Sequence, residues 1–376
     1  MEAKTLRFIW HLIFNFGIIE LFSIFFIAIN VFTFLLYVID KRRAIKGKWR
    51  ISENMLIFFT VSFGGLGALL GMYTARHKTK KRKFKIAAVI GLIAVTIPVI
   101  HIIHALTLDR IIVYREIQFH SENWPVELNG YRIAFMTDMH VIPDEDMRAV
   151  ASELNERNLD LLILGGDFSM NNSHYVGTLR EISAINTTDG IFGVEGNHDD
   201  YIRLFAAKKL HGITPLDNNG IHIQDGFYLA GVRDMWNRDP NINEAISDAY
   251  ENDFILLISH NPDVSMIQDT NEVDLILSGH THRGQITFFG FPMYLLLDHI
   301  TSYRTRFGYE FAYSRDETPV FTSSGVGVYY NVPRIFARPE VVIFTMYSYP
   351  CNTMYNTVLS WKFLFLPLSR ALALHW

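Results

Sequence analysis

The chain has 376 residues, 49% of them hydrophobic, and a formal net charge of -4, which allows one well-packed domain and an additional segment. Residues 1–112 contain 16 Lys or Arg against 5 Asp or Glu, whereas residues 113–376 contain 18 against 33. Because nucleic acids are bound by clustered Lys and Arg, the acidic part argues against a nucleic-acid partner. The single cysteine, Cys351, excludes a disulfide framework and a cysteine-rich zinc site.

The basic N-terminal part contains two uncharged apolar segments, Leu21–Ile39 and Ile86–Leu108. Each is close to the ~20 residues that a helix needs to cross a bilayer, so we expect both to span a membrane. Asn54–Tyr73 lies between them and contains four glycines. It is either a third transmembrane helix whose small residues permit close packing or a re-entrant hairpin that turns at Gly64 and Gly65.

The connecting loops bear on the topology, because positively charged loops tend to stay in the cytoplasm. The loop Asp40–Glu53 has six Lys or Arg and Thr74–Lys85 has seven, whereas Leu108–Gly130 has two. If the middle segment is re-entrant, both basic loops are cytoplasmic and the last span exports everything after it. If it crosses, the C-terminal domain stays in the cytoplasm. We favour the first arrangement, a multi-pass membrane protein with an extracytoplasmic domain.

From Tyr131 onward the sequence changes to short apolar runs separated by polar loops. The runs are rich in β-branched and aromatic residues, as buried strands are; they are YRIAFMT, DLLILGG, GIFGVEG, FILLIS and VDLILSG. Asp144–Arg157, between the first two, has acidic residues at its start and apolar residues at spacings of 3 and 4, which predicts a helix. Alternating strands and helices indicate an α/β domain.

Polar side chains follow each of these runs, and we expect them to meet at one rim of the domain. They are Asp138, His140, Asp167, Asn197, His198, Asp199, His260, His280 and His282. Each alone is readily explained as a turn former or a structural histidine, but turn chemistry does not account for all five strand ends. Imidazole and carboxylate without thiolate suit Mn, Fe or Zn. So many ligands predict two divalent ions about 3.5–4 Å apart.

The ordered set D-x-H, G-D, G-N-H-D, H and G-H-x-H resembles the calcineurin-like metallophosphoesterases, and residues 113–346 resemble their membrane-associated bacterial branch. The resemblance implies an α/β fold with a central β-sandwich flanked by helices. Ile39–Glu53 and Gly64–Phe84 are similar to a small bacterial integral-membrane family. We therefore expect a membrane domain at residues 1–112, the phosphoesterase domain at 113–346, and a tail at 347–376 with no assigned role.

The resemblance also implies a role for each site residue. One metal ion would be bound by Asp138, His140, Asp167 and His282, and the other by Asp167, Asn197, His260 and His280. Asp167 would bridge the ions, and a hydroxide shared by both would attack phosphorus. His198 would stay off the metals and stabilise charge or donate a proton to the leaving group. Asp199 either orients the ring of His198 or is an exposed turn residue.

Arg283 departs from the family pattern, because this branch often has Gly after its G-H-x-H histidines. An arginine beside the second metal's histidines either contacts a substrate phosphate or is a solvated loop residue. The sequence leaves both alternatives open.

Anchoring in a membrane favours a phosphate-ester substrate of the membrane or envelope, including lipid-linked ones. The expected function is hydrolysis of phosphodiester or pyrophosphate bonds. One alternative is a phosphomonoesterase acting on phospholipid, protein or nucleotide. Another class is a non-catalytic metal-binding module, which predicts lost ligands, although all seven ligands and His198 are present.

Overall fold

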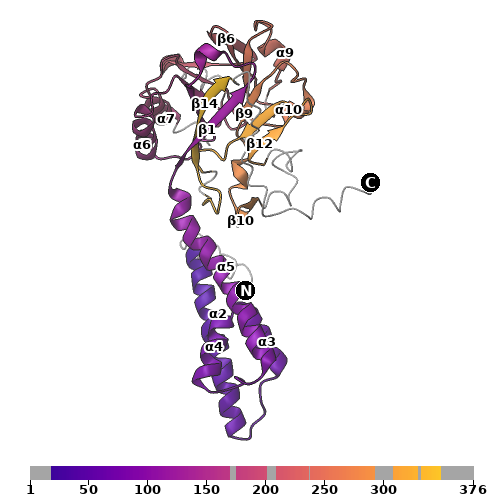
Figure 1. Cartoon of the computed structure of the whole chain (residues 1–376). Helices are drawn as coiled ribbons and strands as arrows, with labels where there is room; N and C mark the ends of the chain where they lie inside the picture. The colour runs from indigo at the N-terminus through magenta and orange to yellow at the C-terminus, as the bar shows by residue number, and fades with distance from the viewer. Residues whose placement is uncertain are drawn as a thin grey trace.

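The computed structural model describes residues 18–169, 175–200, 209–236, 238–292, 308–328 and 332–348. A helical region made from the N-terminal part projects from an α/β domain made from the remainder (Figure 1). The predicted tail begins inside the last strand, which ends at Ser348. The rest of it, including the apolar patch Val358–Leu368, lies outside the described residues.

From Ile18 onward the helical region contains two long helices and two short ones: α2 (Ile18–Ile45), α3 (Glu53–Val61), α4 (Gly65–Thr74) and α5 (Arg82–Leu106). Within α2 and α5, Ser23–Ile45 and Arg82–Leu106 have mean hydropathies of 2.1 and 2.6 and are long enough to cross a membrane. Most of their large apolar side chains are exposed. A helix of a water-soluble domain would bury that face, so these helices suit a lipid environment.

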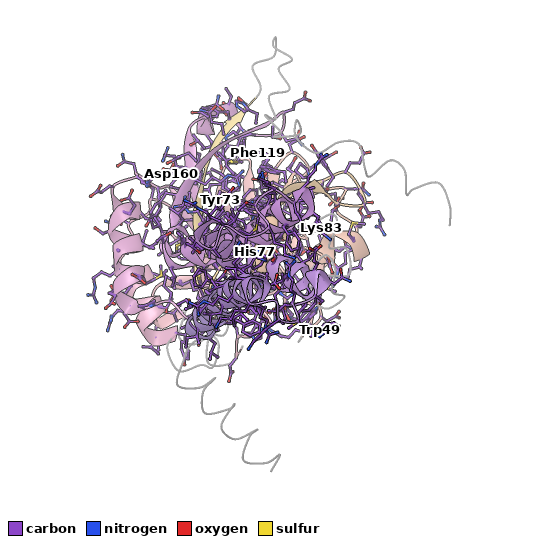
Figure 2. The ribbon with its side chains drawn as sticks, turned by 90° about the horizontal axis from the view of Figure 1, so that it is seen from below. Trp49, Tyr73, His77, Lys83, Phe119 and Asp160 are labelled. Carbon is purple, nitrogen blue, oxygen red and sulfur yellow. The ribbon has the colours of Figure 1, made fainter. Side chains whose placement is uncertain are left out.

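The two short helices form a hairpin that returns to its starting point. Lys78, after α4, lies 2.7 Å from Glu53 at the start of α3 and 3.7 Å from Asp40 in α2. His77 also contacts Asp40, at 2.7 Å, and lies in the middle of the helical bundle in Figure 2. Both ends of the hairpin, and hence both basic loops, therefore lie at the same end of α2.

The turn of the hairpin rests against the side of α2. The Asn30 amide donates to the Phe63 carbonyl at 3.0 Å, and its Oδ1 accepts from the Gly67 N–H at 2.9 Å. A Cβ on Gly67 would lie 1.9 Å from the Asn30 carbonyl oxygen, so a side chain there would push the two helices apart. The segment has the shape of the re-entrant alternative, and its position in a bilayer stays a prediction.

The α/β domain is built on two six-stranded sheets. The first has, in spatial order, β1 (Val113–Ser121), β14 (Glu340–Ser348), β2 (Tyr131–Met136), β3 (Leu161–Leu164), β4 (Ile191–Gly193) and β5 (Ile213–Pro215). The second has β12 (Glu310–Tyr313), β13 (Pro319–Thr322), β9 (Leu275–Ser278), β8 (Phe254–Ile258), β7 (Phe227–Gly231) and β6 (Asn219–Gln224). A short hairpin, β10 (Thr287–Phe288) and β11 (Phe291–Pro292), stands apart.

The two sheets pack face to face around one apolar core, to which Phe135 and Phe344 contribute from the first sheet and Leu256 from the second. The outer face of the first sheet is covered by α6 (Asp144–Asn155) and α7 (Tyr175–Ile182), and that of the second by α9 (Ile242–Ala245) and α10 (Val264–Ile267). The predicted β-sandwich flanked by helices is confirmed. Short 3-10 helices complete the domain: η1 (Leu108–Arg110), η2 (Val126–Leu128) and η3 (His282–Gly284).

The strands that precede the candidate site belong to different sheets. In the first sheet β2, β3 and β4 run parallel, and in the second β8 and β9 run parallel. The five strands are therefore divided between the two sheets of the sandwich. Their carboxyl ends meet at one edge of the sandwich, where loops from both sheets face each other.

Asp109 joins the helical region to the α/β domain. Its Oδ2 contacts the His104 ring at 2.7 Å and accepts the Phe336 N–H at 2.9 Å. His104 belongs to the last turn of α5, and its ring stacks on Phe336 with centroids 3.8 Å apart. The last turn of α5 is thus held against the domain by both polar and aromatic contacts.

Candidate metal centre

A first group of four buried side chains comes from three loops. Asp138 and His140 follow β2, Asp167 follows β3 and His282 follows β9. Each offers one ligand atom within 4.8 Å of all the others. His140 Nε2 lies 3.3 Å from Asp167 Oδ2, and His282 Nε2 lies 3.2 Å from Asp138 Oδ1. These are the four residues expected to bind one ion.

A second group lies on the other side of Asp167. Asn197 Oδ1 is 3.1 Å from His260 Nε2 and 2.9 Å from His280 Nδ1. Asp167 Oδ2 is 3.2 Å from His260 Nε2. One carboxylate oxygen of Asp167 is therefore in contact with both groups, which is the position that a bridging ligand would need.

The loops that carry these residues have unusual backbone conformations. Six residues have φ in the left-handed region, which costs a non-glycine residue of order 1–3 kcal/mol: Asp138 (54°), His140 (36°), Asp167 (56°), His280 (68°), His282 (50°) and Arg283 (53°). Such conformations persist when the surroundings enforce them, and they cluster at functional sites. Here they aim polar side chains inward from an edge where turns normally send them into solvent.

The two histidines of the G-H-x-H motif point to different groups. An extended chain would place residues i and i+2 on the same side, but the positive φ of His280 and His282 breaks the extended form. Gly279 precedes them, and a Cβ there would lie 2.2 Å from Thr137 Oγ1. The close approach of the two loops requires a glycine. As a result His280 contacts Asn197 and His282 contacts Asp138.

The charges within the site are strongly coupled. Burial raises the pKa of Asp138, but His282 and His260 together outweigh it and hold that pKa well below its usual range. Burial lowers the pKa of His260, yet the Asp167 carboxylate raises it to about 10. Burial, with His282, lowers the pKa of His140 to about 3. The carboxylates are therefore ionised and His140 is neutral, which are the forms that bind metals, whereas His260 is protonated and would have to release that proton when an ion binds.

His198 lies beside the two groups. Its backbone N–H donates to Asp167 Oδ1 at 2.9 Å, and its ring centroid is 5.5 Å from that of His140. The residue is half-buried, so a reacting group entering from solvent could reach it. Its role at the leaving group stays a prediction.

Asp199 fastens two of the loops together. One carboxylate oxygen accepts backbone N–H groups from Asp167 and Gly196, both at 2.8 Å, and the other accepts that of Phe168 at 2.9 Å. These contacts fix the loop that carries Asp167, a function that neither sequence-based alternative for Asp199 included.

Two further residues near the site were not found from the sequence. Arg334 is fully buried and donates to the carbonyl groups of Gly327 and Gly325, which fixes the loop after β13. That loop in turn donates N–H groups to the carbonyls of Thr137 and Asp138. Trp236 is exposed, and its ring lies perpendicular to that of His280, with centroids 4.6 Å apart. A single arginine or tryptophan in a loop gives no signal in one sequence.

The donor set fits divalent ions on chemical grounds. Two buried carboxylates, one amide oxygen and four imidazoles face one another. Each histidine nitrogen named above lies within 3.3 Å of another atom that could bind a metal. So close an arrangement of acceptors is favourable when cations lie between them. Asp167 would contact two ions, and the remaining residues divide into the two expected sets.

A two-sheet sandwich with a rim of buried Asp, Asn and His defines the metallophosphoesterase class of domain. The sequence pattern of the calcineurin-like phosphoesterase family matches residues 131–284, and that of the protein-of-unknown-function family DUF1294 matches residues 30–84. This chain therefore carries a calcineurin-like metallophosphoesterase domain behind a DUF1294 region, as the sequence motifs predicted.

Curated relatives carry the same domain. An uncharacterized metallophosphoesterase of Helicobacter pylori is 29% identical over 235 residues, 57% of this chain and 58% of that protein. A "transmembrane protein with metallophosphoesterase domain" of Danio rerio is 25% identical over 76% of this chain and 69% of its own. Phosphodiesterase YaeI of Escherichia coli is 28% identical over 57% of this chain and 81% of its own.

This chain thus matches little more than half the length of the Helicobacter relative. Among solved structures, a phosphopantetheinyl hydrolase (PptH) of Mycobacterium tuberculosis aligns with 56% of this chain and 96% of its own, at 11% identity and a TM-score of 0.30. That likeness is too low to support any argument.

Proposed function

We propose that this chain is a membrane-anchored, binuclear-metal phosphoesterase that hydrolyses phosphodiester or pyrophosphate bonds of a membrane or envelope substrate. The observation that carries the proposal is the position of Asp167 Oδ2, 3.3 Å from His140 Nε2 and 3.2 Å from His260 Nε2. One oxygen shared by two ligand groups suits two ions side by side. Hydrolysis at phosphorus uses such a pair to neutralise both the attacking and the leaving oxygen.

Asp138, His140, Asp167 and His282 would hold one ion, and Asp167, Asn197, His260 and His280 the other. When bound, the two ions would lower the pKa of a water molecule and neutralise charge on the phosphoryl oxygens. No protein base is then needed, and His198 is left to serve the leaving group. It would donate a proton to the leaving oxygen as the bond to phosphorus breaks.

The neighbours of His198 support that role by limiting its movement. Its backbone N–H is held by Asp167 Oδ1, and the loop of Asp167 is fastened by Asp199. A general acid must lie within hydrogen-bond reach of the atom it protonates. Holding the His198 backbone to the proposed shared ligand would limit how far its ring can move relative to a substrate bound at the ions.

The activity test uses the full chain in detergent, stripped with a chelator and reloaded with Mn, Fe or Zn. We expect hydrolysis of bis(p-nitrophenyl) phosphate by the reloaded protein and none by the stripped one. The ratio of rates on this diester and on p-nitrophenyl phosphate distinguishes a phosphodiesterase from a phosphomonoesterase. If no metal restores hydrolysis of either compound, the chain is not a phosphoesterase.

The arrangement of the basic loops supports an extracytoplasmic catalytic domain. Both loops lie at the end of the helical region away from the α/β domain, and positive loops stay in the cytoplasm. Trp49, in the first of these loops, is 94% exposed and lies at the margin of the bundle in Figure 2. Tryptophan at such a position is typical of a membrane–water interface.

Cysteine labelling tests the topology. In a chain with Cys351→Ser, a cysteine replacing the exposed Glu127 in η2 should react with a membrane-impermeant maleimide in intact cells. A cysteine replacing Lys46, in the first basic loop, should react only after lysis, and serves as the matched control. The reverse pattern would place the catalytic domain in the cytoplasm and contradict this part of the proposal.

A further inference from the structure

The β10–β11 hairpin exposes an aromatic surface that a water-facing turn would not have. Phe288 pairs with Phe291, and the two-residue turn between them consists of Phe289 and Gly290, both with positive φ, as a type I′ turn requires. Phe288, Phe289 and Phe291 are 50%, 49% and 55% exposed. Three exposed phenylalanines within four residues mark a surface that contacts something apolar.

The hairpin lies beside the end of α5. The His101 ring stacks on Phe288, with centroids 5.5 Å apart, and packs edge-to-face on Phe289, with centroids 4.6 Å apart. Figure 1 accordingly shows β10 on the side of the α/β domain that faces the helices. The phenylalanines are therefore at the same height as the last two turns of α5.

That height corresponds to the membrane boundary. Lys85 is the last basic residue before the apolar run of α5, and about 20 residues beyond it complete a crossing. This count reaches approximately Ala105, one turn beyond His101. Side chains packed on His101 must then lie at the level of the lipid headgroups or slightly below it. Exposed aromatic rings are favoured at that depth.

A cavity of about 320 Å³ opens behind the hairpin. Its lining includes the rings of His104, Phe289 and Phe336 and three arginines, Arg115, Arg283 and Arg338. The one carboxylate in the lining, Glu340, already accepts hydrogen bonds from Tyr309, Ser323 and Ser324. The cavity therefore combines aromatic side chains with an excess of positive charge.

Two of the three guanidinium groups have no carboxylate partner among the residues that the structure describes. Arg115 is paired with Glu310 at 3.2 Å. Arg283 lies over the Tyr309 ring at 4.1 Å. Arg338 donates to the Ile111 carbonyl at 3.4 Å, while its Nε is buried without a hydrogen-bond partner. Buried donors of this kind are costly unless something accepts from them, and a phosphate is the natural acceptor for arginine.

We propose that the β10–β11 hairpin lies in the interfacial layer of the membrane and that the cavity behind it binds the phosphate of an anionic phospholipid. The inference rests on the proposed function in one respect: Arg283 directly follows His282 in the chain and lines the cavity, so a lipid bound there lies beside the metal centre. The aromatic side chains suit the upper part of the acyl chains, and Arg283 and Arg338 suit the headgroup. This explains the arginine where the family often has glycine.

Depth measurement tests the hairpin. In full chains with Cys351→Ser, reconstituted in phospholipid vesicles, a nitroxide label is attached to a cysteine at Phe288 or, separately, at Phe291. We expect collisions with oxygen to exceed those with a water-soluble nickel chelate at both positions. The matched control is Tyr250→Cys, 70% exposed on the α/β domain, where the nickel chelate should dominate. Nickel-dominated collisions at both hairpin positions would overturn the membrane contact.

Competition tests the cavity. Full chains in nanodiscs of phosphatidylcholine, with and without phosphatidic acid, hydrolyse bis(p-nitrophenyl) phosphate. A lipid present at about four times its Kd should raise the apparent KM about fivefold. The negative charge of phosphatidic acid also repels the anionic diester, and this effect on KM is the same in every variant. The decisive comparison is therefore between two variants. Arg338→Gln should lose most of the increase in KM, and Arg148→Gln should keep it. Arg338→Lys should restore part of the increase.

Each remaining outcome is informative. An increase in KM that Arg338→Gln does not reduce would overturn the cavity assignment. Inhibition of the same size by glycerol 3-phosphate in solution would show that free phosphate occupies the cavity, and would overturn the lipid source. If the protein in phosphatidylcholine nanodiscs hydrolyses no diester at all, the proposed function fails, and the depth measurement still decides whether the hairpin contacts the membrane.

Discussion

Replacing Asp167 by asparagine removes one charge from the centre of the proposed site while keeping the shape of the side chain. Its Oδ2 lies within 3.3 Å of His140 Nε2 and within 3.2 Å of His260 Nε2. Asparagine can still accept the His198 N–H with one oxygen, so the loop should keep its course. The substitution therefore tests charge at the shared position rather than folding.

The size of the effect follows from electrostatics. A unit charge about 4 Å from another, at an effective dielectric constant of about 20, contributes about 4 kcal/mol. Lost from the transition state, that amount corresponds to a rate decrease of about 10³-fold. Since Asp167 would contact two doubly charged ions, this value is a lower bound. Metal content should fall as well, because both ions lose a ligand.

The assay is hydrolysis of bis(p-nitrophenyl) phosphate by the purified full chain, with elemental analysis of the same samples. Asp144→Asn, an exposed aspartate at the start of α6, is the matched control and should keep normal activity and metal content. An Asp167→Asn variant that retains two ions per chain and loses less than about tenfold in kcat/KM would refute the shared-ligand reasoning.

Three other changes have definite expected results. His198→Ala should keep its metals and lose about 10²–10⁴-fold in kcat. The loss in kcat should be smaller on p-nitrophenyl esters than on alkyl esters, because alkyl leaving groups need the proton. Equal losses on both would argue against a general acid. Arg334→Met should leave buried carbonyl groups without donors and lower the free energy of unfolding of the α/β domain by about 2–3 kcal/mol, measured by denaturant titration against Arg148→Gln. Asn30→Leu removes both hydrogen bonds to the hairpin turn and should destabilise the helical region by about 1–2 kcal/mol. The measurement is the melting temperature in detergent, which should fall. An unchanged melting temperature would show that the turn is held by packing alone.

The sequence by itself determined the class of domain and the strands that precede the candidate site, since the five apolar runs are β2, β3, β4, β8 and β9. Buried strands have to be apolar, and side chains that serve a metal have to be Asp, Asn or His, so both leave a signal in the chain. The helix predicted at Asp144–Arg157 is α6, Asp144–Asn155. The residues expected at the strand ends do face one another, because parallel strands bring their carboxyl ends to one edge whichever sheet they belong to.

Only the tertiary structure decided how those residues divide and what surrounds them. The division of the strands between the two sheets, and their order in each, depends on long-range pairing that no local pattern encodes. His280 and His282 separate because their backbone is left-handed, a conformation imposed by neighbouring loops. Long-range contacts also decided the position of the α3–α4 hairpin against α2, because its turn contacts a residue 37 positions earlier in the chain. They likewise placed Arg283, a loop residue in the sequence, in the lining of a basic cavity.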